Sequence, residues 1–349
     1  MNNGKQYLVT LDHPEEAERM AAVAGIGDLN ASDGVPVLLE RLAKESSRAV
    51  RISIFRVLKR IDSDAAIEAS IRLLGSDDPE MRNQAVEVLR HKGARSIPFL
   101  IPVMQDGDKD LRKFVLDALN GLQGDGADVI YETALSDQDL NVVITALEYL
   151  GRGRAAQFRN RIEELLVAGS QPMLVGACLK ALSEIGEEAS LIPIRRRFPD
   201  LTTLPDFFLV PCLAAIGVLG TAGEFAEVAA LLGVRGPNLR APVLGALFAI
   251  HQRHPVRAWS KELLPALRAI VEDGDPPLCR YQAVRALDSI PFRDDVYSFL
   301  VSCLSSPERM VRLAAVETLR LASRPGLEGL LASLALEETD EGVLQALIR

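Results

Sequence analysis

Residues 76–106 read SDDPEMRNQAVEVLRHKGARSIPFLIPVMQD, and this stretch predicts a helix, a turn and a second helix. Asp78-Pro79 is typical of a helix start, because a carboxylate can cap free N–H groups and proline loses no hydrogen bond there. One apolar stripe then follows with helical spacing, formed by Met81, Ala85, Val88 and Leu89. Lys92-Gly93 favours the end of this helix, and a second apolar helix is expected before the next Asp-rich turn.

The same pattern recurs along almost the whole chain at intervals of roughly 30 to 40 residues. The residues that close the stripe of each first helix are Val23, Leu58, Leu89, Leu119, Leu150, Leu182, Ile216, Leu247, Leu287 and Leu319. About ten helical hairpins in register predict an all-α solenoid, in which each repeat packs mainly on its neighbours.

We expect a single array over residues 1–349, because no linker or low-complexity segment interrupts the pattern. In the first repeat, Glu15 and Arg19 stand where the other stripes are apolar. A polar outer helix is what a terminal repeat needs, so residues 1–45 are predicted to form an N-terminal cap. Residues 340–349 restart the pattern and are predicted to form a C-terminal capping half-repeat.

Composition restricts the functional classes. Hydrophobic residues make up 48% of the chain, which supports a packed core, and the net charge of −9 argues against general affinity for nucleic acid. Four cysteines in 349 residues do not form a disulfide framework. The first residues lack the apolar run of a signal peptide, and no run of eighteen apolar residues occurs, so we expect a soluble cytoplasmic protein.

Five first helices open with an acidic or turn residue and continue to an apolar residue followed by Arg. These openings lie at 47–51 (SRAVR), 78–82 (DPEMR), 108–112 (DKDLR), 236–240 (GPNLR) and 308–312 (ERMVR). Together with residues 181–186 (ALSEIG), they resemble the HEAT-like repeats of the phycobilisome-lyase (PBS lyase) type, over roughly residues 15–349. The resemblance implies a right-handed, armadillo-type superhelix with an Asp–Arg ladder between repeats and second helices along a concave face.

This family hosts several functions. Deoxyhypusine hydroxylases of this fold hold two irons with His-Glu pairs, but the four histidines here are followed by Pro, Lys, Gln and Pro. We therefore expect no metal, cofactor or catalytic residue and predict a non-enzymatic scaffold that binds an extended protein surface. A lyase or oxidoreductase activity of the phycobilisome-lyase type remains the alternative, since that chemistry leaves no short motif. Nucleic-acid binding is a third possibility.

Three apparent motifs have simpler explanations. Residues 106–110 (DGDKD) imitate a calcium loop, but the sixth position is Leu111 where the loop requires Gly, so a helix-capping turn is favoured. Residues 151–156 (GRGRAA) match a dinucleotide fingerprint, yet a predicted helix precedes them where a strand is needed. Cys178 and Cys212 occupy equivalent places in adjacent repeats, too far apart for a disulfide, and are expected to be buried.

An arginine cluster is the candidate binding site. The ladder arginine is replaced by Val143, Val175 and Leu209 in three central repeats, where the net charge also changes from −7 over residues 101–150 to +2 over residues 151–200. The buried stripes predicted for the second helices leave Arg159, Arg161, Arg195, Arg196 and Arg197 exposed or at the border. We expect these five side chains to form one patch for an acidic segment of a partner protein. An ordinary solvated surface is the alternative.

Overall fold

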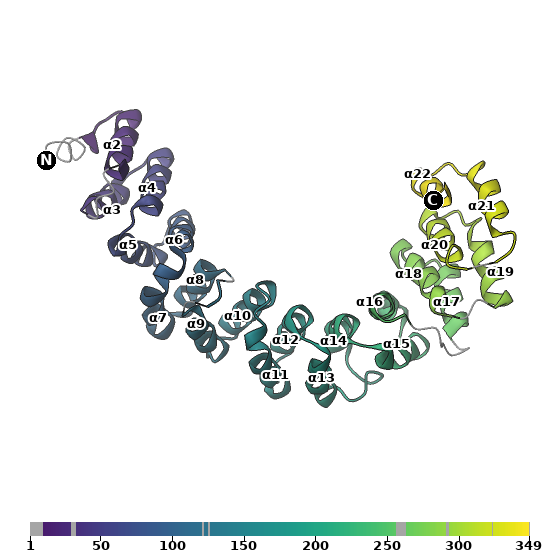
Figure 1. Ribbon diagram of the computed structural model, residues 1–349. Coiled ribbons are helices and arrows are strands. Elements are labelled where there is room, and N and C mark those ends of the chain that lie inside the picture. Colours follow the sequence, from purple (N-terminus) through teal and green to yellow (C-terminus); the bar gives the residue numbers. More distant parts are fainter. Residues whose placement is uncertain are drawn as a thin grey trace. The chain divides into compact units, whose positions relative to one another are not determined.

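The computed structural model describes residues 10–28, 33–120, 122–124, 126–255, 263–290, 293–322 and 324–348. Within these ranges all the regular secondary structure is helical, and first and second helices alternate along the chain (Figure 1). This arrangement confirms the predicted all-α solenoid class. None of the helices in the described part combines the length and apolar character needed to span a bilayer.

Contacts divide the chain into two compact units, residues 1–155 and residues 156–349. The boundary falls inside the fifth predicted repeat, between its first and second helix. The prediction of a single array over residues 1–349 therefore stays a prediction.

The N-terminal unit contains the first helices α2 (Glu16–Asp28), α4 (Arg48–Arg60), α6 (Pro79–Lys92), α8 (Lys109–Leu119) and α10 (Leu140–Arg152). Its second helices are α3 (Gly34–Lys44), α5 (Asp64–Leu74), α7 (Ile97–Asp106, preceded by the short η1, Gly93–Ser96) and α9 (Ala127–Leu135). Successive first helices pack on one another, and α5 packs on α6.

The C-terminal unit contains the first helices α12 (Pro172–Ile185), α14 (Asp206–Leu219), α16 (Arg240–Arg253, after η4, Pro237–Leu239), α18 (Pro277–Ala286, before η5, Leu287–Ser289) and α20 (Arg309–Leu319), then α22 (Glu341–Ile348). Its second helices are α11 (Arg159–Ala168, after η2, Ala156–Phe158), α13 (Leu191–Arg197, after η3, Glu188–Ser190), α15 (Ala222–Val234), α17 (Leu263–Glu272), α19 (Asp294–Cys303) and α21 (Leu327–Ala335). The predicted C-terminal half-repeat thus corresponds to α22, which packs on α20 and α21.

Helix α6 starts and ends where its sequence predicts. The Asp78 side chain accepts a hydrogen bond from the N–H of Glu80 at 2.8 Å, with Pro79 at the first helical position. Gly93 follows the helix at φ 57°, a conformation that costs glycine little. Lys92 points back to the previous repeat, where its ammonium donates to the carbonyl oxygen of Lys59 at 2.8 Å. The helix end therefore also joins two repeats.

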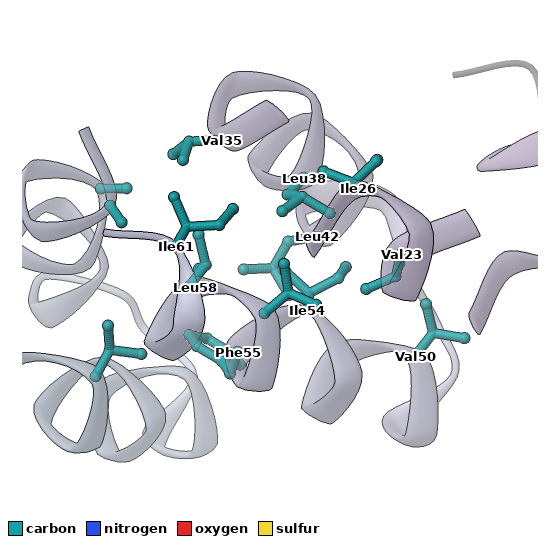
Figure 2. Close-up of a cluster of buried hydrophobic side chains, with 14 of the residues drawn as sticks. Val23, Ile26, Val35, Leu38, Leu42, Val50, Ile54, Phe55, Leu58 and Ile61 are labelled. Carbon is teal, nitrogen blue, oxygen red and sulfur yellow. The ribbon is translucent and has the colours of Figure 1, made fainter. Parts of the chain in front are cut away.

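The apolar stripes form a core shared between repeats. In α6, Ala85, Val88 and Leu89 are fully buried and Met81 is half-buried. Figure 2 shows how Ile26 from α2, Leu38 from α3 and other side chains from α4 converge at the start of the chain. Because each stripe packs on its neighbours, no repeat encloses a core of its own.

The register predicted for the first repeat is wrong by almost one turn. The N–H of Arg19 bonds to the Glu15 carbonyl oxygen just as the N–H of Arg51 bonds to Ser47, so Arg19 occupies the ladder position of α2. By this register Ile26, rather than Val23, corresponds to the closing residue of the stripe. Arg19 is only 9% exposed, so it is not part of a polar outer face.

Candidate partner-binding surface

The arginine ladder implied by the resemblance is present on several first helices. Arg112 contacts both carboxylate oxygens of Asp137 at 2.6 and 2.7 Å, and Arg312 contacts those of Glu338 at 2.8 and 2.9 Å. Arg240 reaches an Asp275 oxygen at 2.6 Å. In each pair the carboxylate belongs to the turn before the next first helix. The ladder therefore ties the start of one repeat to the start of the next.

A ladder arginine also holds the turn that precedes its own helix. Arg312 Nη1 donates to the carbonyl oxygen of Ser306 at 2.9 Å, and Arg82 Nη1 donates to that of Ser76 at 2.6 Å. Backbone carbonyls in a turn lack helical partners, so the guanidinium satisfies them. The hydrogen bonds from Arg312 are the main cause that lowers the pKa of Glu338 to about 2.

The central helices replace the ladder with apolar contacts. Val175 and Leu209 are fully buried, and Val143 is 6% exposed. Arginines at the ends of second helices hold the turns instead. Arg197 Nη2 donates to the Gly169 carbonyl oxygen at 2.9 Å, and Arg235 donates to the carbonyl oxygens of Thr202 at 2.7 Å and Leu204 at 2.9 Å. Sequence reasoning missed these bonds because they join residues about a repeat apart.

The five arginines of the candidate site lie on two neighbouring helices. Arg159 and Arg161 belong to α11, and Arg195, Arg196 and Arg197 belong to α13. The two helices pack side by side within the C-terminal unit. The two helices that carry the arginines are therefore neighbours, and a single patch formed by the five side chains stays a prediction.

Four of the five arginines already contact groups of the chain. Arg159 pairs with Glu187 at 2.6 Å, and Arg161 pairs with Glu164 at 3.1 Å. Arg195 reaches across to Glu227 on α15 at 2.7 Å. These three side chains are 25% to 35% exposed. These three guanidinium groups are therefore already paired with carboxylates of the same chain.

Arg197 corrects one detail of the prediction. It was expected to be exposed, but it is half-buried, with its guanidinium 5.9 Å from the ring centroid of Phe198. Arg197 turns inward because its guanidinium donates a hydrogen bond to the Gly169 carbonyl oxygen. Arg196 points outward as predicted and is exposed. No described hydrogen bond or ion pair involves its side chain.

The position of the second helices also differs from what the resemblance implies. In the C-terminal unit taken by itself, the row of α12, α14 and α16 follows the inner side of the bend, and the row of α11, α13 and α15 follows the outer side (Figure 1). The first helices pack more extensively on one another than the second helices do, as expected on the inside of a bend. The arginines therefore do not line a concave face of this unit.

A second surface was not recognised in the sequence. Helix α14 exposes Phe207, Val210 and Val218, whose exposed fractions are 59%, 41% and 47%. Its sequence, DFFLVPCLAAIGVL, has only one charged residue, so apolar side chains surround the helix. The lack of a polar face was the available signal, because an ordinary surface helix has one.

The capping turn at Asp108 and the burial of two cysteines agree with the sequence-based expectations. Asp108 caps α8 through hydrogen bonds from the N–H groups of Asp110 and Leu111, both at 2.9 Å, as the helix-capping interpretation predicts. Cys178 and Cys212 are buried and free, and burial raises the pKa of each thiol to about 12. The described residues contain no group of three His, Cys, Asp or Glu side chains that could hold a metal ion.

Comparison with known proteins supports the repeat assignment. No curated protein matches the chain. The finer resemblance to the phycobilisome-lyase type stays a prediction. Residues 6–90 match the family model described as HEAT repeats, and this stretch contains the first two hairpins and most of α6.

Proposed function

We propose that the chain is a non-enzymatic protein-interaction scaffold that binds an acidic segment of a partner through the α11–α13 surface. Stacked helical hairpins expose long surfaces suited to extended partners, and proteins with HEAT repeats commonly bind other proteins. The observation that carries the site is Arg196, an exposed cation on a helix whose neighbouring arginines are held in place. Arg195 and Arg197 fix α13 through Glu227 and Gly169, so Arg196 is presented on a rigid support.

The chemistry of the surface favours carboxylates. A guanidinium offers a planar pair of donors that matches a carboxylate, and Arg161 lies on the adjacent helix with 35% of its side chain exposed. Arg161 pairs with Glu164 of its own helix at 3.1 Å. Such an exposed pair contributes little, so a partner carboxylate can compete for it. Because the chain as a whole is acidic, it repels an acidic ligand elsewhere and attracts it at Arg161 and Arg196.

The experiment is affinity purification from native cells followed by quantitative mass spectrometry, with wild-type protein and the double variant Arg161→Glu/Arg196→Glu. We expect one or more partners with an acidic segment to be lost with the double variant and retained with Arg60→Glu, a control with an exposed arginine on α4. Circular dichroism melting should be unchanged for both variants, because exposed charges contribute little to stability. Recovery of the same partners with the double variant would exclude this surface.

The same experiment separates the alternatives. Partners removed by nuclease treatment would indicate nucleic-acid binding through the arginines. Attachment or release of the tetrapyrrole of a captured protein in the presence of the chain would indicate a lyase of the phycobilisome-lyase type. Consumption of a redox cofactor would indicate an oxidoreductase.

A further inference from the structure

Helix α14 carries a continuous apolar stripe on its exposed side. Phe207, Val210, Ala214 and Val218 follow one another at i, i+3, i+7 and i+11, and all four are exposed. This spacing places them on one face over about three turns of helix. The opposite side of α14 is buried in the core through Leu209, Cys212, Leu213, Ala215 and Ile216.

The helices on the two sides border this stripe in different ways. Helices α12 and α16 pack on α14 from either side. On α16 the positions equivalent to the stripe include Ala241, Gly245 and Ala249, and on α12 they are Met173, Gly176, Lys180 and Glu184. A Cβ added to Gly217 would lie 3.0 Å from the Cα of Ala246, so α14 and α16 approach closely. Small residues therefore flank the bulky side chains of α14 along α16, whereas α12 adds an exposed methionine and two charged side chains.

The repeat pattern shows that this surface is exceptional. Ala214 and Gly245 occupy equivalent positions on α14 and α16. Most other first helices carry a charge at this position, namely Arg56, Glu87, Asp117, Glu148, Lys180, Arg285 and Glu317. The exposed side of the repeat is therefore normally charged. The four stripe residues and Ala241, Gly245 and Ala249 on α16 are uncharged, and Arg253 at the end of α16 donates to the carbonyl oxygens of Gly217 and Gly220.

We propose that this surface binds an amphipathic helix of a partner protein, with an apolar stripe toward α14 and acidic residues on its flanks. The uncharged stripe selects an uncharged occupant, because a charge buried there would have no counter-charge. An amphipathic helix offers anchors with the same spacing as the stripe. Lys180 on α12 and Arg253 on α16 are exposed cations on the two sides of α14, which favours acidic flanks on the bound helix.

The shape of the C-terminal unit disfavours a second copy of the chain as the occupant. The row of first helices follows the inner side of the bend, and two inner sides cannot pack on each other along their length (Figure 1). This inference rests on the proposed role as an interaction scaffold, but it does not depend on the arginine surface.

The test uses the full chain and a synthetic, fluorescein-labelled peptide of about five helical turns. The peptide has Leu at i, i+3, i+7 and i+11, Glu on the flanks of this stripe, and neutral polar residues elsewhere. A scrambled peptide of the same composition is its control. Fluorescence anisotropy measures both against wild-type chain, Val210→Glu/Val218→Glu, and Ile192→Glu, which changes an exposed apolar residue of α13 in the other row.

We expect saturable binding of the amphipathic peptide to wild-type chain and to Ile192→Glu, and at least about tenfold weaker binding to the α14 double variant. Equal binding of the scrambled peptide, no saturable binding, or no effect of the α14 variant would overturn the proposal. A concentration-dependent dimer that the α14 variant abolishes, measured by sedimentation equilibrium, would assign the stripe to a second copy and also overturn it. Arg161→Glu/Arg196→Glu should leave peptide binding unchanged, so failure here and failure of the arginine surface are separable.

Discussion

Arg19 and Glu45 form a buried, two-point ion pair between the first helix and the turn before α4. Arg19 Nε lies 2.9 Å from Glu45 Oε2, and Nη2 lies 3.1 Å from Oε1. The Glu45 side chain is fully buried and also accepts a hydrogen bond from the N–H of Ser47 at 2.7 Å. The third nitrogen of Arg19 holds the carbonyl oxygens of His13 and Pro14. The ladder therefore begins in the first repeat, although its sequence there differs from the later rungs.

Arg19→Ala should destabilise the N-terminal unit by about 1–3 kcal/mol, because it removes a two-point ion pair from the buried Glu45 carboxylate and leaves Arg41, at 2.8 Å, as its remaining cation. Urea unfolding followed by circular dichroism measures the loss. Lys44→Ala is the matched control, since Lys44 forms an exposed pair with Asp12 at 3.1 Å and should cost less than about 1 kcal/mol. An Arg19 variant as stable as the Lys44 variant would contradict the ladder assignment in this repeat.

Acid should weaken the contact between α20 and the turn before α22. Hydrogen bonds from Arg312 lower the pKa of Glu338 to about 2, from its ordinary value of 4.5. A carboxyl group whose folded-state pKa is depressed stabilises the fold above its unfolded pKa, and this contribution disappears as the pH falls through the folded pKa. Between pH 5 and pH 2, the loss attributable to Glu338 should approach about 3 kcal/mol.

Glu338→Gln provides the control for this prediction. The variant should be less stable than wild type at pH 6, and the difference should shrink as the pH falls below about 4. Thermal melting at each pH measures both quantities. A constant difference across this range would show that the Glu338 charge does not contribute.

The fold could be predicted from the sequence because its determinants are local. The cap at Asp78, the stop at Gly93 and the spacing of the stripe to Leu89 all lie within one helix, and each agrees with the structure. The first repeat was misaligned because Val23 and Ile26 are both buried apolar residues one turn apart. Periodicity alone cannot separate them, whereas the contacts of Arg19 do.

The candidate site was less predictable because its contacts join different repeats. The stripe of α13 correctly turned Arg196 outward, but the partners of Arg195 and Arg197 lie about 30 residues away. A sequence pattern on one helix contains no information about such a partner. Helix α14 was missed for a different reason: its apolar side chains occupy every face, so the pattern did not reveal that one face is exposed.

Leu89→Ala should destabilise the protein by about 2–5 kcal/mol, because Leu89 is fully buried where α6 meets its neighbours. The lost methyl groups leave a cavity that stacked helices can close only partly. Leu336→Ala is the control, since Leu336 is 88% exposed and its removal should change the free energy of unfolding by less than about 0.5 kcal/mol. Equal effects of the two substitutions would show that the predicted stripe is not the core.

The four cysteines should be unreactive in the folded protein. Burial raises the thiol pKa to about 12 for Cys178 and Cys212 and to about 11 for Cys279 and Cys303. The thiolate is the reactive form, so it is scarce at pH 8 in all four. An aromatic disulfide reagent should titrate almost no thiol in native protein and all four after denaturation. Rapid labelling of a native thiol would indicate that the surrounding helices open readily.

Arg196 and Arg197 should separate binding from stability on a single helix. Arg197 donates to the Gly169 carbonyl oxygen at 2.9 Å and is half-buried, so Arg197→Ala should destabilise the C-terminal unit by about 1–3 kcal/mol. Arg196 is exposed, so Arg196→Ala should change stability by less than about 0.5 kcal/mol while weakening capture of an acidic partner. Denaturant unfolding measures the free energy of unfolding of both variants, and partner capture measures their binding. A large stability loss for Arg196→Ala would show that it also supports the fold, and an unchanged stability for Arg197→Ala would remove its assigned role in holding the turn before α12.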